Sequence, residues 1–487
     1  MARDLRMQGS GRSFVRDILL GFIPVSINKL TSLIYLPLIF KYAGVAAYAI
    51  WQQFGLSAQV LMHLGTMNVG VGIKKYLAQK ADLAEISKIF YSALAWVVIF
   101  SILCSAVLLW GKEHFGNLIF TGSNGGLLIV LLIVYIPLEA LLSEIANVIR
   151  AIRAMKVLAI LGPLRVLIKL ATVTVALIFL DATIVHAIAY FIAGEFAMLI
   201  VFLITLWTRL GLRTFVVDLK EAWKYVSYGF PFVVAGISTW ISAFSDRFFL
   251  LHYFGLEQVG IYAGAYVISS IPLLFANPIC QILLPDLSKL LGLGQNQKAV
   301  MRAEGVMLVY GLIAGCLSIV IVTAGPTAIE WLGRTSVGSI KLMLLLATAL
   351  GAYGLLTLQS NVLTAFLGRS HFNLIWVAIA ICNILLNLLL IPRFNVIGAA
   401  IASLGTYCLG SMAMAMALHP KMKSWYLLWV YALLGLGITL GTCGSHFLVE
   451  HLTLVRLALV TILAMIAYTG TAFILFRRQI LTITQSR

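Results

Sequence analysis

Long apolar segments recur along the whole chain and are separated only by short loops. Hydrophobic residues occupy 62% of the 487 positions, and charged residues occupy only 10%. A helix of about 20 apolar residues is long enough to cross the hydrocarbon core of a bilayer. Soluble domains carry a much larger share of charged residues. The pattern therefore predicts an all-α, polytopic membrane protein.

We predict about 14 transmembrane helices from the lengths of these segments. They cover residues 18–40, 50–70, 89–110, 126–149, 157–180, 184–206, 226–250, 258–284, 303–325, 341–367, 372–391, 395–418, 424–442 and 453–476. Lys and Arg favour cytoplasmic loops, and most basic loop residues fall on one side when the N-terminus is placed in the cytoplasm. Both termini are therefore expected to be cytoplasmic. The first apolar run is too long for a signal peptide and lacks a small-residue cleavage site, so we interpret it as an uncleaved helix.

Short stretches of sequence recur at a nearly constant offset. Residues 40–51 resemble residues 251–262, and Asn147 corresponds to Asn361. Six predicted helices separate the copies, and because this number is even, both copies cross the membrane in the same direction. A parallel repeat of this kind is a transporter architecture. We predict two pseudo-symmetric six-helix lobes and two extra C-terminal helices with a cytoplasmic tail, at residues 1–215, 216–420 and 421–487.

Charged residues inside the predicted spans are the main functional candidates. The cations are Lys29, Arg165, Lys169 and Arg247, and the acids are Glu139, Glu144, Glu195 and Asp246. A charge at bilayer depth costs several kcal/mol unless it faces a partner or a wet cavity. At a helix rise of ~1.5 Å per residue, most of those in the first lobe fall near the membrane midplane. The sequence therefore predicts a polar chamber there, with a balance of charge available to an anion.

Two interpretations of these midplane charges remain open. Arg165 and Lys169 lie four residues apart and share one helix face, level with Glu139 on the preceding helix. They form either an ion-pair network that holds the lobe together or a cationic wall that binds phosphate or pyrophosphate. The two interpretations are compatible, since carboxylates can hold the cations in place until an anion arrives. Glu195 is also a candidate proton site.

The second lobe carries fewer charges at this depth. Asp246 and Arg247 lie near the outer end of a span and point about 100° apart on a helix, which predicts that they are poor partners for each other. Interfacial snorkelling and a functional role are both compatible with this position. The remaining polar residues predict an uncharged chamber suited to sugar hydroxyls, or simple interhelical hydrogen bonds. They are Gln359, Asn361, Asn383 and Asn387.

Several function classes are disfavoured by the sequence. The net charge of +17 arises from basic residues beside helix ends, so we attribute it to membrane topology and expect no nucleic-acid partner. A G-x-x-x-x-G-K-[ST] motif does not occur, which argues against energy from nucleotide bound by this chain. The six cysteines are scattered without metal-ligand spacing. We expect no cofactor, no metal and no catalytic residue.

Two motifs carry a resemblance to a known family. One runs from Asp246-Arg247 through Gly255 to Tyr266, and the other runs from Asn387 through Pro392 to Ala402. They resemble the signatures of Wzx-type polysaccharide-biosynthesis flippases, in the multidrug/oligosaccharidyl-lipid/polysaccharide exporter (MOP) superfamily. The resemblance implies a V-shaped bundle of two lobes that works by alternating access.

The resemblance also implies a cargo and a place. The cargo would be an undecaprenyl-diphosphate-linked oligosaccharide, for O-antigen of lipopolysaccharide or for exopolysaccharide. It would move from the cytoplasmic to the periplasmic leaflet of the bacterial inner membrane, coupled to ion or proton movement. Membrane lipids, a polysaccharide polymerase and chain-length proteins are the implied partners.

The family's cavity cations imply roles for individual residues here. Lys29, Arg165, Lys169 and Arg247 would bind the pyrophosphate. From their own positions in the spans, Glu139, Glu195 and Asp246 are candidates for coupling ions or protons or for holding the cations. In the superfamily's lipid II flippases the last two helices form a groove for the lipid tail, which implies such a groove here. Lys29 lacks the adjacent acid of those flippases, and this departure disfavours a peptidoglycan precursor as cargo.

Two other functions are weighed against this one. A multidrug or cation antiporter of the same superfamily would need an anionic cavity, whereas cations predominate here. A membrane polysaccharide polymerase or ligase would generally need a large external loop with catalytic groups, and the predicted outer loops are short. The chain is therefore expected not to be an enzyme.

Overall fold

The computed structural model is helical over nearly all the residues it describes. Those residues are 27, 30–77, 83–120, 124–152, 154–208, 211, 214–333, 340–422, 425–446 and 461–471. No strand occurs in these ranges, and the prediction of an all-α fold is confirmed. Lys29 lies outside the described residues.

The lengths of the helices agree with a polytopic membrane protein. Among the described residues, 7 helices are long and apolar enough to cross a membrane, or 8 if the bent pair Leu219–Gly229 and Pro231–Ser269 forms one span. Three shorter apolar helices accompany them: Leu30–Tyr42, Leu428–Cys443 and Thr461–Thr471. Each of the predicted spans overlaps one of the helices in the structure.

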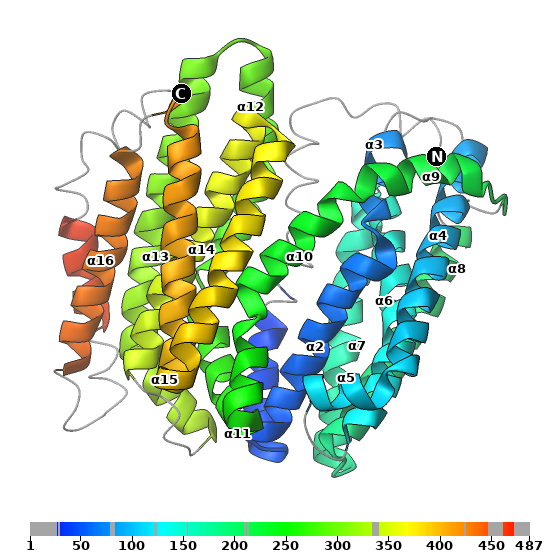
Figure 1. Ribbon diagram of the computed structural model, residues 1–487, viewed down its shortest axis with the longest axis horizontal. Helices are drawn as coiled ribbons and strands as arrows, with labels where there is room; N and C mark the ends of the chain where they lie inside the picture. Colours follow the sequence, from blue (N-terminus) through cyan, green and yellow to red (C-terminus); the bar gives the residue numbers. More distant parts are fainter. Residues whose placement is uncertain are drawn as a thin grey trace. The chain divides into compact units, whose positions relative to one another are not determined.

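The chain divides into two compact units, residues 1–237 and 238–487. The helices of the first unit (Figure 1) are α2 (Val45–Thr66), α3 (Val69–Leu77), α4 (Leu83–Trp110), α5 (Lys112–Ile119), α6 (Gly125–Ala151), α7 (Met155–Thr174), the π-helical turn η2 (Val175–Phe179), α8 (Ile184–Thr208) and α9 (Leu219–Gly229). Helix α6 packs against α2, α3, α4, α5, α7 and α8, so it forms the centre of this unit. The predicted lobe boundaries stay a prediction.

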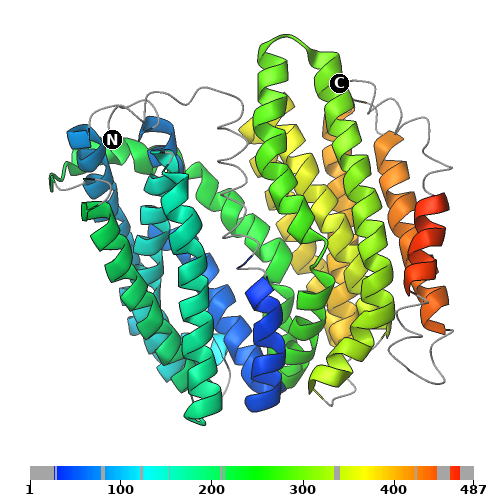
Figure 2. The same cartoon turned by 180° about the vertical axis from the view of Figure 1, so that it is seen from behind.

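The second unit is built from longer helices. They are α11 (Asp246–Ser269), α12 (Leu273–Gly292), α13 (Asn296–Gly333), α14 (Ile340–Leu367), α15 (Arg369–Leu418) and α16 (Trp425–His446), while α10 (Pro231–Phe244) runs across the boundary between the units. In Figure 2 the red helix Thr461–Thr471 lies beside the orange α16. Tyr468 of that helix and Leu433 of α16 share a buried cluster with Ile319 of α13.

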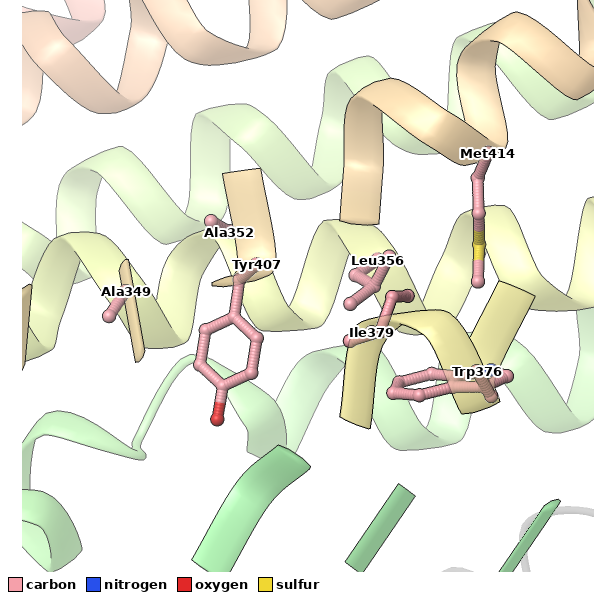
Figure 3. Packing of buried hydrophobic residues seen from close by; sticks show 7 residues of the cluster. All are labelled: Ala349, Ala352, Leu356, Trp376, Ile379, Tyr407 and Met414. Atoms are coloured by element: carbon pink, nitrogen blue, oxygen red, sulfur yellow. The ribbon is translucent and has the colours of Figure 1, made fainter. Parts of the chain in front are cut away.

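Close packing between α14 and the two halves of α15 forms one buried core cluster of the second unit. Figure 3 shows Ala349, Ala352 and Leu356 of α14 against Trp376, Ile379, Tyr407 and Met414 of α15. Trp376 is only 2% exposed, and its indole N–H donates to Ser360 Oγ at 3.2 Å. A buried indole usually finds such an acceptor, and here the bond fixes the register of α15 against α14.

Breaks in the helices reproduce the repeat predicted from the sequence. Gly44 (φ 90°, ψ 173°) precedes α2, and Gly255 (φ 80°, ψ −177°), which lies 211 positions further on, interrupts α11. Asp181 (φ 45°) precedes α8, and Asn395 (φ 52°), which lies 214 positions further on, interrupts α15. Gly, Asn and Asp tolerate positive φ better than other residues. The two units therefore turn the chain at corresponding places with residues suited to those turns.

Helix α9 begins with a charged cap beside the first turns of α4. The Asp218 carboxylate accepts a hydrogen bond from the backbone N–H of Glu221 at 3.0 Å. Lys88 Nζ lies 3.0 Å from Asp218 Oδ2 and 2.9 Å from Glu221 Oε2. The hydrogen bond from Glu221 N–H and the pairing with Lys88 hold the pKa of Asp218 below its usual range.

Candidate functional site

Four ionisable side chains from three neighbouring helices meet inside the first unit. Glu139 comes from α6, Arg165 and Lys169 come from α7, and Glu195 comes from α8. The three helices all pack against one another. Arg165 and Lys169 share a helix face because they lie four residues apart. We call this set the charged quartet.

Arg165 joins the two carboxylates of the quartet. Its Nε donates to Glu195 Oε2 at 2.6 Å, and its Nη2 donates to Glu195 Oε1 at 3.0 Å. The same Nη2 also donates to Glu139 Oε2. Such a two-pronged contact between guanidinium and carboxylate is among the stronger hydrogen-bonded pairs in proteins. It sets the orientation of the guanidinium toward both acids.

Lys169 completes the quartet from the next turn of α7. Its ammonium pairs with Glu195 Oε1 and lies 4.0 Å from Glu139 Oε2. It also lies 5.1 Å from the ring centroid of Phe191, within the range of a cation–π contact. The predicted proximity of Glu139, Arg165 and Lys169 is therefore observed, and Glu195 joins them.

Burial differs among the four side chains. Glu195 is 0% exposed, whereas Arg165, Lys169 and Glu139 are 17%, 18% and 19% exposed. The formal charges of the quartet sum to zero. The cations are therefore already paired, which is the feature expected of an ion-pair network, and three of the four groups also retain a small exposed surface.

Aromatic rings surround one side of the quartet. Tyr135 O–H donates to Glu139 Oε2 at 2.9 Å from one turn earlier on α6. The Tyr135 ring lies 5.5 Å from Phe54 and 5.4 Å from Phe191, and Phe191 in turn lies 5.2 Å from Trp51. Apolar rings beside the charges lower the local dielectric constant and strengthen the electrostatic interactions of the quartet. Sequence reasoning missed Tyr135 and Phe191, although the four-residue spacing of Tyr135 and Glu139 places them on one helix face.

Close packing of α7 against α8 supports the position of Glu195. Gly194 precedes Glu195, and a Cβ atom at Gly194 would lie 3.0 Å from Thr172 Cγ2 and 3.2 Å from Ile168 Cγ2 on α7. The glycine therefore allows the two helix backbones to approach closely, as small residues do in membrane helix pairs. Because α7 and α8 lie so close together, the Glu195 side chain can contact both Arg165 and Lys169.

A second polar centre lies in the other unit. Asp246 and Arg247 are both 2% exposed, and Arg247 Nη1 lies 3.1 Å from Asp246 Oδ1. The expectation that these neighbours would be poor partners is therefore wrong, because the long Arg side chain folds back past the helix surface to the adjacent acid. Tyr262 O–H also donates to Asp246 Oδ2, at 2.6 Å.

Aromatic rings enclose the guanidinium of Arg247. Its Cζ lies 4.2 Å from the ring centroid of Tyr266, 5.3 Å from Phe244 and 5.5 Å from Tyr262. A buried, ring-enclosed guanidinium differs from the snorkelling side chain that one interpretation predicted. Within the described residues, Arg247 Nε makes no hydrogen bond although it is buried.

Uncharged polar side chains of the second unit bond across helices, as one interpretation expected. Ser245 Oγ donates to Asn383 Oδ1 at 2.8 Å, and Asn387 Nδ2 donates to the same oxygen at 2.9 Å. Asn383 Nδ2 donates in turn to Thr406 Oγ1 at 3.2 Å. These bonds satisfy polar groups that would be costly to leave unpaired in an apolar interior.

Glu144 occupies a separate polar row near the end of α6. It is 2% exposed, and its Oε2 accepts from Asn147 Nδ2 at 3.3 Å. Asn147 Oδ1 accepts from Arg150 Nη1 at 3.0 Å. Among the described residues, no group of three or more His, Cys, Asp or Glu side chains is arranged to hold a metal ion.

Comparison with solved structures identifies the fold. The lipid II flippase MurJ in its inward closed conformation aligns with a TM-score of 0.73 and 14% identity, covering 95% of this chain and 100% of that one. A MOP superfamily transporter of Pyrococcus furiosus aligns at 0.58 with 13% identity, covering 86% and 96%. A mutant MATE transporter of Vibrio cholerae aligns at 0.61 with 15% identity, covering 86% and 100%. The chain thus has the fold of MOP superfamily membrane transporters.

The sequence places the chain within a family. Residues 14–291 match the family model described as polysaccharide biosynthesis protein, and this match covers more than half of the chain. The chain belongs to the polysaccharide biosynthesis protein family, as the resemblance of its motifs predicted. No curated protein matches it in overall sequence comparison. Its structural neighbours are flippases and transporters rather than enzymes, in agreement with the prediction for this chain.

Proposed function

We propose that the protein is a flippase for an undecaprenyl-diphosphate-linked oligosaccharide. The cargo moves from the cytoplasmic to the periplasmic leaflet of a bacterial inner membrane by alternating access. Membership of the polysaccharide biosynthesis family supports a glycan-linked cargo, and the fold supports transport across a bilayer. The observation that carries the proposal is the charged quartet, which holds two cations within a helical membrane bundle.

The chemistry of the cargo matches the cations of the quartet. A polyprenyl diphosphate linked to a sugar carries its negative charges on phosphate oxygens, which accept hydrogen bonds from several donors at once. The guanidinium of Arg165 supplies a planar fork of donors, and the ammonium of Lys169 supplies a compact charge one helical turn away. Partial exposure of both side chains, at 17% and 18%, leaves part of each within reach of a ligand.

Further residues complete the proposal. Lys29 and Arg247 are additional candidates for the diphosphate, and Asp246 is the acid that holds Arg247. Glu139 and Glu195 hold the cations when the cargo is absent and are candidates for coupling to protons or ions. Both chain ends lie in the cytoplasm, and a polysaccharide polymerase and chain-length proteins act on the product, which is used for O-antigen or exopolysaccharide.

A drug or cation antiporter is the second candidate, because the fold is shared with MATE transporters. The quartet argues for the flippase, since a site for cationic drugs would be expected to carry a net negative charge, whereas these four residues sum to zero. The exposed parts of Arg165 and Lys169 offer donors to a phosphate oxygen, whereas a neutral quartet gives no net attraction to a cationic drug.

Reconstitution tests the proposal directly. The purified chain is placed in liposomes with a fluorescent undecaprenyl-diphosphate oligosaccharide, and its movement between leaflets is followed by access of a quencher. We expect wild-type protein to move the lipid, and Arg165→Ala and Lys169→Ala to lose at least about tenfold in rate, because each removes one phosphate donor. Transport of an organic cation without movement of the lipid would instead establish the antiporter.

A further inference from the structure

The neutrality of the charged quartet constrains how an anion binds there. A diphosphate diester brings two negative charges, whereas Arg165 and Lys169 are already matched by Glu139 and Glu195. Adding the cargo to the intact quartet would place an excess of negative charge in a region of low dielectric, where repulsion is strong. At least one carboxylate therefore has to give up its contacts with the cations when the cargo binds.

Glu195 is held too firmly to be that carboxylate. Both of its oxygens contact cations, since Oε1 and Oε2 each accept from Arg165 and Oε1 also pairs with Lys169. Its side chain is 0% exposed, and the neighbouring Gly194 lets α7 and α8 pack closely at this level. Glu195 thus keeps the guanidinium oriented and has no exposed path along which to withdraw.

Glu139, in contrast to Glu195, is partly exposed and is held through a single oxygen. All of its hydrogen bonds and ion pairs with the described residues are made by one oxygen, Oε2, which contacts Arg165, Lys169 and the hydroxyl of Tyr135. The contact between Glu139 Oε2 and the ammonium of Lys169 is the longest in the charged quartet, at 4.0 Å. The Glu139 side chain is 19% exposed, which matches the exposure of the two cations. The three partly exposed groups therefore meet at a single carboxylate oxygen.

We infer that Glu139 is the exchangeable carboxylate of this site and Glu195 its fixed counter-ion. A phosphate oxygen of the cargo takes the place of Glu139 Oε2 against Arg165 and Lys169, while Glu195 keeps both cations in position. Glu139 then competes with the cargo and returns to the cations when the cargo leaves. This inference rests on the proposed function of the same cluster.

Carboxylate exchange predicts opposite changes in affinity for two Gln variants, whereas a loss of folding would lower affinity in both. Glu139→Gln replaces the competing carboxylate with a neutral amide and removes no phosphate donor. The cargo should therefore bind more tightly and leave more slowly. Glu195→Gln removes the group that orients Arg165, so binding should become weaker. Glu139→Asp keeps a competing carboxylate, so its affinity and turnover should resemble those of the wild-type protein. Glu113→Gln is the matched control, because Glu113 lies on α5 with its side chain 79% exposed.

The experiment measures affinity and turnover on the same full-length preparations. Affinity for a polyprenyl diphosphate is measured in detergent micelles, and turnover of the fluorescent lipid-linked oligosaccharide is measured in liposomes. We expect Glu139→Gln to bind about tenfold more tightly and to turn over about tenfold more slowly, and Glu195→Gln to bind about tenfold more weakly. Glu113→Gln should match wild type in both measurements, and each variant is first checked for a single folded species by gel filtration.

The outcomes separate this inference from the proposed function. Suppose that wild-type protein binds and moves the lipid. If Glu139→Gln then binds the lipid more weakly, or if the two Gln variants change affinity equally, the proposed carboxylate exchange is refuted and the flippase function is not. If wild-type protein neither binds the diphosphate nor moves the lipid, the proposed function fails and the inference falls with it. Tighter binding together with slower turnover in Glu139→Gln alone supports the exchange.

Discussion

Arg165 Nε lies 2.6 Å from Glu195 Oε2, where the Glu195 side chain is fully buried. The pair joins α7 to α8, and Lys169 and Glu139 extend it to α6. Burial makes such a pair sensitive to the loss of one partner, because the remaining charge cannot regain water. The cluster that we propose for cargo binding is therefore also a structural element of its unit.

Glu195→Ala should destabilise the first unit by about 3 kcal/mol, because two largely buried cations, at 17% and 18% exposure, would share one carboxylate. Thermal unfolding of the purified protein in detergent measures this loss. The double variant Arg165→Met with Glu195→Leu leaves Lys169 and Glu139 as a matched pair, so it should recover most of the stability. Equal destabilisation by the single and double variants would contradict a role for charge balance.

Gly194→Ala should separate α7 from α8 beside the quartet. Its added Cβ would lie 3.0 Å from Thr172 Cγ2, closer than ordinary van der Waals contact. We expect lipid movement in liposomes to fall about tenfold, because small misplacements of binding groups have large effects on rate. Thr172→Ser removes that methyl group, so the double variant should regain part of the activity. Failure of Thr172→Ser to restore any activity would argue against this contact.

Gly255→Ala should cost about 1–3 kcal/mol of unfolding free energy, because φ 80° with ψ −177° is a conformation almost restricted to glycine. No heavy atom lies within 4 Å of the added Cβ, so the cost comes from the backbone alone. Gly435→Ala is the control. Gly435 lies within helix α16, its Cβ would also meet nothing within 4 Å, and alanine favours helix there. Similar melting temperatures for the two variants would refute the argument.

The stabilising effect of Asp218 should depend on pH. Its pKa is lower in the folded protein than its ordinary value, so its contribution is complete above the ordinary pKa and is lost as pH falls through the lowered value. The difference in melting temperature between wild type and Asp218→Asn should therefore be largest near neutral pH and shrink in acid. Asp218→Ser keeps a capping oxygen without a charge, and its stability relative to Asp218→Asn should not vary with pH.

The helices and the membrane class were predictable because they depend on local properties. Apolar length alone indicated the spans, and each predicted span overlaps a helix. The offset between Gly44 and Gly255 was visible in the sequence and reappears as matching breaks in the backbone. Spacing on α7 also placed Arg165 and Lys169 on one face. Tyr135 and Phe191 escaped notice, since aromatic residues are common in apolar spans.

By itself, the sequence determined that this chain is a helical membrane protein with an internal repeat and ionisable groups at membrane depth, because hydrophobic length and residue spacing act along one helix at a time. Only the tertiary structure decided which charges meet. Arg165 and Glu195 stand 30 positions apart, and their contact depends on how α7 and α8 are rotated and how closely Gly194 lets them approach. The folding back of Arg247 onto Asp246 was likewise decided by packing, because the surrounding aromatic rings leave the guanidinium no exposed route to water.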